Sequence, residues 1–248
     1  MWVARLVKHV LDFCYPGACA ACESSCDGST FLCPACDAQL LVLERAPACD
    51  HCAMPLGQEG APCPYCEGKG VPHYDRVVRL GVFDDPLRHL IHQLKYHRRW
   101  PLAEFLADRL MGQERARGIL TQTQVLVPIP LHRLRQVARG YNQADVVARR
   151  IGKRCGIPVA RPIVRLRQTE TQTHLHSRKQ REQNLRGAFA LIDPKPVAGR
   201  HVVVIDDVTT TGATLQAFAR ALVPARPASL CAMAVALADP LGRDFQAM

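Results

Sequence analysis

The sequence predicts an α/β protein in which a largely parallel sheet, flanked by helices, follows a small cysteine-rich module. Three observations lead to this prediction. The chain has 248 residues, of which 48% are hydrophobic, and this is globular composition. Ten of the 12 cysteines lie in the first 66 residues. From about residue 76 onward, strand-like and helix-like segments alternate, which is typical of a parallel sheet covered on both faces.

Composition also bounds the class of protein. The apolar content is too high for intrinsic disorder, and no apolar run reaches the roughly 18 to 20 residues that a membrane-spanning helix needs. Residues 1–13 are expected to form a short amphipathic helix, because large apolar residues recur there at helical spacing. The same segment is interrupted by basic residues and has no small-residue cleavage site, unlike a secretory signal. We therefore expect a cytoplasmic protein.

Eight cysteines form four C-x-x-C pairs within residues 14–70, which we predict to be a double metal-binding module. The last two pairs repeat the first two at an offset of 30 residues, and this repeat indicates an internal duplication. The pairs are Cys19/Cys22, Cys33/Cys36, Cys49/Cys52 and Cys63/Cys66.

Two C-x-x-C turns together supply the four-sulfur tetrahedral site that structural Zn²⁺ prefers, so we predict about two zinc ions per chain. Sequential pairing of the turns is our choice, and interleaved pairing stays open. A four-thiolate iron–sulfur cluster also fits these residues. A disulfide framework suits an exported chain, and a thioredoxin-like site normally uses one pair. Cys14, Cys26 and His51 exceed the needs of two sites and are expected to be packed or spare residues.

The predicted helices after the module rest on caps and apolar spacing. Asp84-Asp85-Pro86 is a helix start with an acidic cap, and the apolar residues that follow place Lys95 near the end of that helix. A second helix begins near Pro101, and Trp100 before it is expected to pack in the core or between helices. Two more helices are expected over residues 142–154, closed by Gly156, and 212–222.

The predicted strands are short apolar runs between these helices. HVVVID at 201–206 is the strongest of them, because its residues 202–205 are all β-branched and apolar. The remaining candidates are 125–130, 159–164, 188–192 and 229–237. In a sheet of this kind, ligands bind at the carboxyl ends of the strands.

Positive charge is concentrated in one part of the chain. Residues 95–186 hold 20 basic and 6 acidic side chains, a surplus of 14, whereas the whole chain carries +10. A positive field of this size concentrates phosphates, either of a nucleotide or of a nucleic acid. The alternative is a well-solvated arginine-rich face.

Residues 202–214, VVVIDDVTTTGAT, carry the predicted chemistry. Four apolar residues bring Asp206 and Asp207 to a strand end, and a hydroxyl-rich turn with Gly212 then enters a helix. Such a turn presents backbone N–H groups, threonine hydroxyls and the positive helix end to one phosphate. The two carboxylates can accept hydrogen bonds from sugar hydroxyls or hold the water shell of a Mg²⁺ ion. A strand and turn with incidental acids is the alternative.

Other phosphate-binding loops do not fit. A P-loop requires Gly-Lys-Ser/Thr, but Ala213 and Thr214 follow Gly212. The dinucleotide fingerprint G-x-G-x-x-G is absent from the sequence.

The segment VVVIDDVTTTGAT resembles the phosphoribosyl pyrophosphate (PRPP) motif of type I phosphoribosyltransferases. LIHQLKYHRR (90–99), VPIPLHRLRQVARGYNQA (127–144) and RQTETQTHLHSRKQREQNLRGAF (167–189) resemble the ComF family. Members of that family, including ComFC and GntX-like proteins, carry an N-terminal zinc ribbon. The resemblance covers nearly the whole chain and implies a type I phosphoribosyltransferase-like domain over residues 76–248.

The resemblance also implies roles for individual residues. Asp206 and Asp207 would bind the ribose hydroxyls and serve in catalysis. Residues 168–184 match a mobile loop that closes over PRPP, in which Arg178 and Arg181 would shield developing charge; a solvated loop is the alternative. The remaining PRPP-binding residues cradle the 5′-phosphate or lie at the pyrophosphate end. They are Thr209, Thr210, Thr211, Gly212, Ala213, Thr214, Lys95, Arg139, Gly140, Tyr141 and Asn142.

The function that the resemblance implies is a PRPP-binding protein acting in competence and DNA uptake. Single-stranded DNA and proteins of the competence machinery would be its partners. If it is an enzyme, pyrophosphate would leave C1 of PRPP with help from Mg²⁺, and phosphoribosyl would pass to an acceptor that the sequence does not identify. The alternative is a non-catalytic PRPP sensor or a single-stranded-DNA-binding adaptor.

Overall fold

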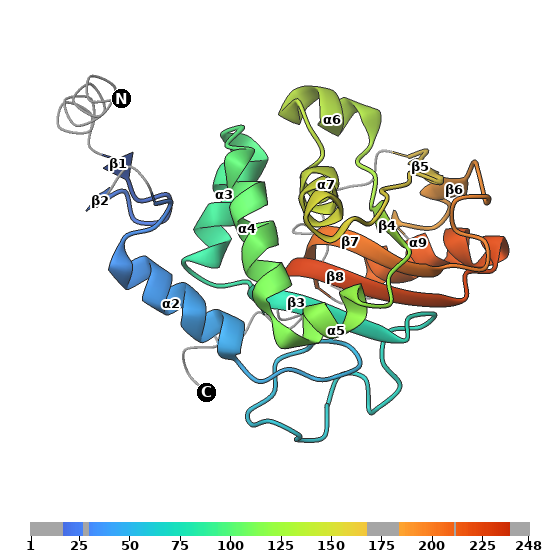
Figure 1. Cartoon of the computed structure of the whole chain (residues 1–248), viewed down its shortest axis with the longest axis horizontal. Helices are drawn as coiled ribbons and strands as arrows, with labels where there is room; N and C mark the ends of the chain where they lie inside the picture. The colour runs from blue at the N-terminus through green and yellow to red at the C-terminus, as the bar shows by residue number, and fades with distance from the viewer. Residues whose placement is uncertain (1–16, 27–29, 168–183, 211, 239–248) are drawn as a thin grey trace.

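The computed structural model of the protein describes residues 17–26, 30–167, 184–210 and 212–238 (Figure 1). The predicted helix over residues 1–13 and nearly all of the predicted mobile loop lie outside these ranges. So do Cys14, Arg178, Arg181 and Thr211. No helix in the described part of the chain is long and apolar enough to cross a membrane.

A sheet of four parallel strands forms the centre of the molecule, in the order β3-β8-β7-β4. These strands span Arg76–Val82 (β3), Val125–Pro128 (β4), His201–Thr209 (β7) and Ser229–Leu237 (β8). The prediction of β4 and β8 is confirmed, and β7 runs three residues beyond the predicted 201–206. All four carboxyl ends therefore lie along one edge of the sheet.

Strand β3 is absent from the sequence-based prediction, because Arg76 and Arg79 interrupt its apolar run. Arg79 is nevertheless only 6% exposed. Its Nη2 donates hydrogen bonds to the carbonyl oxygens of Ala46 and Pro47, at 3.1 and 3.2 Å. A guanidinium can be buried in a strand when its donors meet backbone acceptors in this way.

Two predicted strands do not join the parallel sheet. Strands β5 (Ile163–Arg165) and β6 (Phe189–Leu191) pair with each other, antiparallel, in a separate two-stranded sheet. Of the predicted segment 159–164, Val159 contributes only an isolated bridge to Leu126 of β4. The expectation that these segments extend the main sheet is wrong.

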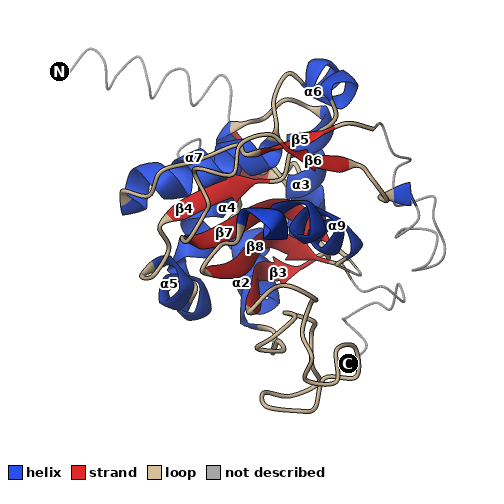
Figure 2. Ribbon diagram, turned by 90° about the vertical axis from the view of Figure 1, so that its right-hand side faces the viewer, coloured by secondary structure: helices blue, strands red, loops and turns tan. Residues whose placement is uncertain are grey.

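The main sheet separates two cores of buried side chains. The turned view in Figure 2 shows the sheet with helices packed around it. Val203 and Ile205 of β7 pack with α3 (Leu87–Tyr96), α4 (Pro101–Gly112) and α7 (Gln143–Cys155). The alternate residues Val202 and Val204 pack on the other face with α9 (Ala213–Leu222). Successive side chains of a strand point to opposite faces, so a fully apolar strand such as β7 fits this position.

The predicted helices that fall within the described residues form, with one error in the capping. Asn142 caps α7 by accepting a hydrogen bond from the N–H of Ala144, and Gly156 ends that helix at a φ of 70°. At α3, however, the N-cap is Pro86, and no side chain caps the helix. The expected acidic cap is wrong there, because Asp85 pairs instead with Arg88 and His89.

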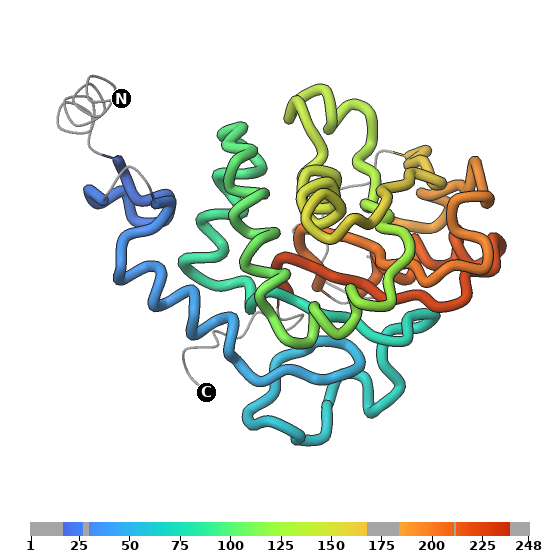
Figure 3. Tube along the Cα trace, viewed as in Figure 1, coloured from blue at the N-terminus to red at the C-terminus, as the bar shows by residue number. Residues whose placement is uncertain are grey.

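Within the part of the chain that the structure describes, three α-helices and the short 3-10 helix η2 (Val223–Ala225) were not predicted. Helix α2 (Pro34–Arg45) starts directly after Cys33 and carries Cys36; helices α5 (Glu114–Leu120) and α6 (Arg133–Arg139) are short. A small hairpin of β1 (Gly17–Ala18) and β2 (Ser25–Cys26) lies before α2. In the chain trace of Figure 3, α2 runs from this hairpin toward the irregular segment of residues 46–75. The cysteine pairs thus lie at the two ends of α2.

Candidate functional site

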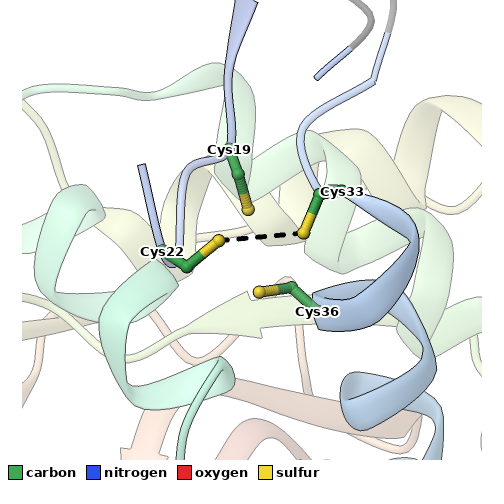
Figure 4. A group of neighbouring side chains, drawn as sticks. All are labelled: Cys19, Cys22, Cys33 and Cys36. Atoms are coloured by element: carbon green, nitrogen blue, oxygen red, sulfur yellow. Dashed lines mark hydrogen bonds between the residues drawn. The ribbon is translucent and has the colours of Figure 1, made fainter. Parts of the chain in front are cut away.

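The eight cysteines of the C-x-x-C pairs form two compact groups, and the sulfur atoms of each lie within 4.8 Å of one another. Figure 4 shows the first group, Cys19, Cys22, Cys33 and Cys36, with their side chains pointing toward one centre. The second group is Cys49, Cys52, Cys63 and Cys66. The pairing is therefore sequential, as chosen from the sequence, and the interleaved alternative is wrong.

The spacing of the sulfur atoms fits a bound zinc ion. Sulfur–sulfur distances are 3.7 Å for Cys22–Cys33, 3.7 Å for Cys49–Cys66 and 3.6 Å for Cys52–Cys63. A tetrahedron with Zn–S bonds of about 2.3 Å has edges of about 3.8 Å, whereas a disulfide requires about 2.05 Å. The two groups therefore suit structural zinc.

Local backbone geometry produces these groups. In four places the carbonyl oxygen of a cysteine accepts a hydrogen bond from the N–H four residues later, which closes the turn. The donors are Glu23, Asp37, Ala53 and Glu67, at 2.9 to 3.0 Å. Such turns aim both sulfur atoms of a C-x-x-C to the same side. Cys26 and His51, the surplus candidates that the structure describes, lie outside both groups.

A cavity of about 550 Å³ opens at the carboxyl edge of the main sheet. Its wall holds both carboxylates of the predicted motif, Asp206 and Asp207, together with Thr210 and Thr214. Five cationic side chains also line it: Arg88, Lys95, Arg135, Arg139 and Arg165. The cavity therefore brings together hydrogen-bond acceptors for a sugar and cations for phosphate groups.

Asp206 is the most unusual group in this cavity. Its side chain is 7% exposed; one oxygen accepts a hydrogen bond from the N–H of Asp207 at 2.9 Å, and Oδ2 is buried without a partner among the described residues. Burial and the adjacent charge of Asp207 raise the pKa of Asp206 to about 7. A buried carboxylate oxygen without a donor fits a ligand that supplies a hydroxyl or a cation.

Asp207 lies beside Lys95 of α3. The Nζ of Lys95 is 3.1 Å from Oδ2 of Asp207, and Oδ1 accepts a hydrogen bond from the N–H of Val208 at 2.7 Å. Lys95 was expected at the pyrophosphate end of the site. The structure pairs it with the carboxylate instead, within the same cavity.

The residues of the threonine-rich turn face two different cavities. Thr210 and Thr214 line the cavity, and Thr210 also lines, together with Thr209 and Gly212, a smaller cavity of about 290 Å³. Gly212 is the N-cap of α9 with a φ of 74°, a left-handed conformation that a residue with a side chain rarely adopts. Ala213 is 2% exposed, in the core. The turn thus has one face toward the site and one face toward the rest of the protein.

The loop after β4 forms the opposite wall. Nδ2 of Asn142 donates to the carbonyl oxygen of Ile129 at 2.9 Å, which holds the end of α7 to the end of β4. Arg139 donates to Oε1 of Gln143 at 3.2 Å and lies 5.7 Å from the ring centre of Tyr96. The hydroxyl of Tyr141 donates to the carbonyl oxygen of Leu94, which ties the loop to α3.

The cationic side chains of the cavity repel one another. Burial lowers the pKa of Arg165 to about 10, and the charge of Arg135 contributes to the shift. Burial also lowers the pKa of Arg135, with a contribution from Arg139. Like charges this close are stabilised by an anion between them. Sequence reasoning assigned no role to the cavity residues Arg88, His92, Arg135 and Arg165. His92 and Arg135 lie in the segments 90–99 and 127–144 that resemble the ComF family, Arg135 and Arg165 belong to the basic surplus of residues 95–186, and no signal marked Arg88.

A second basic groove, of about 580 Å³, adjoins the cavity through Arg139. Gly140 and Tyr141, expected in the PRPP site, line this groove rather than the cavity. Trp100 also lines it and is 53% exposed. The expectation that Trp100 is a packing residue is wrong, because it lies at the N-cap of α4 and its indole is not covered by the core.

Comparison with known proteins agrees with this arrangement. Residues 99–245 match the Phosphoribosyl transferase domain family, and residues 10–67 match the Double zinc ribbon domain family. The chain is 36% identical over 215 residues to the DNA utilization protein YhgH of Salmonella typhi, covering 84% of this chain and 91% of that protein. It is 34% identical over 196 residues to Competence protein F of Haemophilus influenzae, covering 77% and 83%. It is also 36% identical over 101 residues to Competence protein ComFC of Bacillus subtilis, covering 40% and 38%.

Proposed function

The chain belongs to the ComF family of phosphoribosyltransferase-domain proteins with a double zinc ribbon, and on this premise we propose that it binds PRPP, or a related phosphorylated ribose, together with Mg²⁺. The observation that carries the proposal is the pair of adjacent carboxylates, buried Asp206 and half-buried Asp207. It stands beside a threonine-rich turn and faces a cavity with five cationic side chains.

The residues divide among the parts of the ligand. Thr210, Thr214 and the backbone N–H groups at the start of α9 would hold the 5′-phosphate, because a helix N-terminus stabilises anionic charge. The buried oxygen of Asp206 would accept a hydrogen bond from a ribose hydroxyl, which ends its lack of a partner. Arg139 and Arg135 lie across the cavity, where the pyrophosphate would be placed.

Magnesium fits the donor set, because carboxylates with their water shell are what Mg²⁺ prefers. Asp206 and Asp207 would hold the ion through its waters, and when bound it would neutralise charge that develops on a leaving pyrophosphate. The arginines of the cavity would stabilise the same charge as fixed cations. Little covalent work by side chains is required.

Calorimetric titration of the zinc-loaded protein with PRPP and Mg²⁺ tests the proposal. Asp206→Ala and Asp207→Ala should each weaken PRPP binding at least about tenfold, since each removes a hydrogen-bonding carboxylate. Asp193→Ala is the matched control, because Asp193 is an exposed carboxylate that does not line the cavity. Unchanged affinity in both site variants would show that the site is assigned incorrectly.

We further propose that the bound PRPP undergoes transfer, with release of pyrophosphate. Supplying the protein with PRPP, Mg²⁺ and a panel of purine and pyrimidine bases should then produce pyrophosphate above the background without acceptor. Binding of PRPP with no pyrophosphate release on any acceptor favours the alternative, a sensor that only reports the ligand.

The cysteine groups lead us to propose two structural zinc ions per chain and a place in the cytoplasm, where thiols stay reduced. Elemental analysis should find about two zinc atoms per chain and little iron. Iron in place of zinc would support the iron–sulfur alternative.

The groove beside Trp100 favours a second function, binding of single-stranded DNA in competence or DNA uptake. It combines an exposed indole with Arg98, Arg149 and Lys153, and relatives are named for DNA utilization and competence. Bases stack on exposed aromatic rings while cations follow the backbone. Trp100→Ala should weaken binding of an oligothymidine roughly tenfold, and affinity should fall with salt by about 0.7 log units per phosphate contact. A flat salt response would exclude this function.

A further inference from the structure

The two cysteine groups arise from a repeat in the sequence, yet they belong to different cores, one on each face of the sheet. Cys19, Cys33 and Cys36 belong to the core that contains α3, α4 and α7. Cys49, Cys52 and Cys63 belong to the core that contains α9. Because α9 begins at the threonine-rich turn, only the second group shares a core with the element that would hold the 5′-phosphate.

The segment after the second group touches that turn directly. A Cβ atom placed on Gly212 would lie 3.4 and 3.6 Å from the two methyl carbons of Val71. Val71 is 9% exposed and follows Cys66 by only five residues. The N–H of Lys69 donates to the carbonyl oxygen of Cys66 at 2.8 Å, so the connection is compact. A short, hydrogen-bonded segment thus joins the ligand cysteine Cys66 to Val71, which lies against the turn.

Further contacts fasten this segment to the same region. The buried hydroxyl of Tyr74 donates to the carbonyl oxygen of Leu215, in the first turn of α9, at 3.0 Å. The carbonyl oxygen of His51, between two ligand cysteines, accepts from the N–H of Val77 in β3 at 3.0 Å. A cavity of about 290 Å³ remains between the two parts, with Cys66 and Thr209 among its lining residues.

The turn needs such support. Gly212 holds the start of α9 without a side-chain cap and in a left-handed conformation. A glycine in this position leaves the backbone free to adopt other conformations unless packing restricts it. Val71 and Tyr74 supply that restriction from the side opposite the cavity.

We propose that the second cysteine group is a positioning element for the phosphate-binding turn. Its bound metal would hold Val71 and Tyr74 against the turn and the first turn of α9, and would thereby set the affinity for ligands that carry a 5′-phosphate. The first group has no comparable contact among the described residues. The inference rests on the proposed function, because it concerns the same phosphate site.

The proposal predicts different effects on ligands that occupy different parts of the site. Ribose 5-phosphate uses the turn, whereas inorganic pyrophosphate uses the cations across the cavity. Val71→Ala should weaken binding of ribose 5-phosphate and PRPP about fivefold or more and leave pyrophosphate affinity unchanged. General destabilisation would lower all three affinities together.

Val197→Ala is the matched control. Val197 is a fully buried valine of the same core, but it lies in the chain before His201, at the other end of β7. The Val197→Ala variant should unfold at a lower temperature than the wild type but bind ribose 5-phosphate with unchanged affinity. Equal effects of Val71→Ala and Val197→Ala on ribose 5-phosphate binding would overturn the proposal.

The metal itself is tested with one cysteine from each group. Cys63→Ser and Cys33→Ser should each lower the zinc content to about one per chain, and only Cys63→Ser should weaken ribose 5-phosphate binding. Equal loss in both variants, or no loss in Cys63→Ser, contradicts the proposal. Failure of the wild-type protein to bind any of the three ligands contradicts the proposed function instead, and the positioning role with it.

Discussion

At the scale of single residues, the feature that stands out is a carboxylate held where its charge is costly. Asp206 is 7% exposed, and its Oδ2 has no partner among the described residues. Burial and Asp207 raise its pKa to about 7. A side chain that served folding alone would be neutral here, so its cost to stability is consistent with a role in binding.

The destabilisation of the folded protein by ionised Asp206 depends on pH. Because the pKa of Asp206 is higher in the folded than in the unfolded protein, the unfolded chain loses the proton first as pH rises. The folded protein therefore loses stability as the pH rises from about 4 to about 7. Asp206→Asn removes the titration, so the ligand-free variant should be more stable than the wild type at pH 8, by an amount on the order of a few kcal/mol.

Urea denaturation at pH 8 and pH 5 measures the difference in free energy of unfolding between Asp206→Asn and the wild type. This difference should be smaller at pH 5. The variant should at the same time lose affinity for PRPP and Mg²⁺. A variant less stable than the wild type at pH 8 would show that Asp206 is stabilising in its ionised form.

At the scale of elements, close packing of α7 on β4 positions the loop of residues 139–142, which we propose to lie at the pyrophosphate end of the site. A Cβ on Gly152 of α7 would lie 2.6 Å from the carbonyl oxygen of Ile157 and 3.0 Å from Val159. Val159 in turn bridges to Leu126 of β4. The helix can approach the strand because it has a glycine there, and Asn142 at its other end then reaches Ile129.

Gly152→Ala tests whether tight packing or helix propensity has the larger effect on stability at this position. Alanine normally stabilises a helix by about 1 kcal/mol relative to glycine. Here the added carbon overlaps a backbone oxygen, so we expect a net loss on the order of 1–3 kcal/mol in chemical denaturation. Gly118→Ala in α5 is the matched control, because nothing lies within 4 Å of its Cβ and the substitution should stabilise. A stabilising Gly152→Ala would contradict the tight contact.

At the scale of the whole molecule, Arg109 connects the zinc-ribbon module to the transferase-like domain. From α4, its Nε donates to Glu44 at 2.7 Å and its Nη1 to Asp37 at 2.8 Å, both on α2. The Glu44 side chain is only 5% exposed, and burial raises the pKa of its carboxyl even though Arg109 acts in the opposite direction. Removing the arginine would leave a buried carboxylate without its cation.

Arg109→Met should therefore lower the free energy of unfolding by about 2–4 kcal/mol at pH 7. The loss should diminish toward pH 4, because protonation of Glu44 removes the uncompensated charge. Adding Glu44→Gln to Arg109→Met should restore much of the stability, and zinc content should not change in either variant. A loss that is independent of pH and of Glu44 would indicate lost packing of the arginine stem instead.

Local patterns in the sequence account for much of the fold and for the centre of the site. The C-x-x-C repeat predicted two sulfur groups because each pair closes its own turn, and hydrophobic periodicity predicted α3, α4 and α7. The apolar run before Asp206 predicted the strand that ends in the site. Helices α2 and α5 were missed, because α2 begins among cysteines and α5 covers only seven residues.

What the sequence by itself determined is therefore local: turns that aim two thiolates together, apolar periods that make helices and strands, and a strand end that carries two carboxylates. Only the tertiary structure decided that Arg135 and Arg165 meet Asp206 in one cavity, that Trp100 is exposed, and that Val71 lies behind Gly212. The reason is physical. Local structure depends on spacing along the chain, whereas contacts between distant residues depend on how sheet order and close packing bring their elements together.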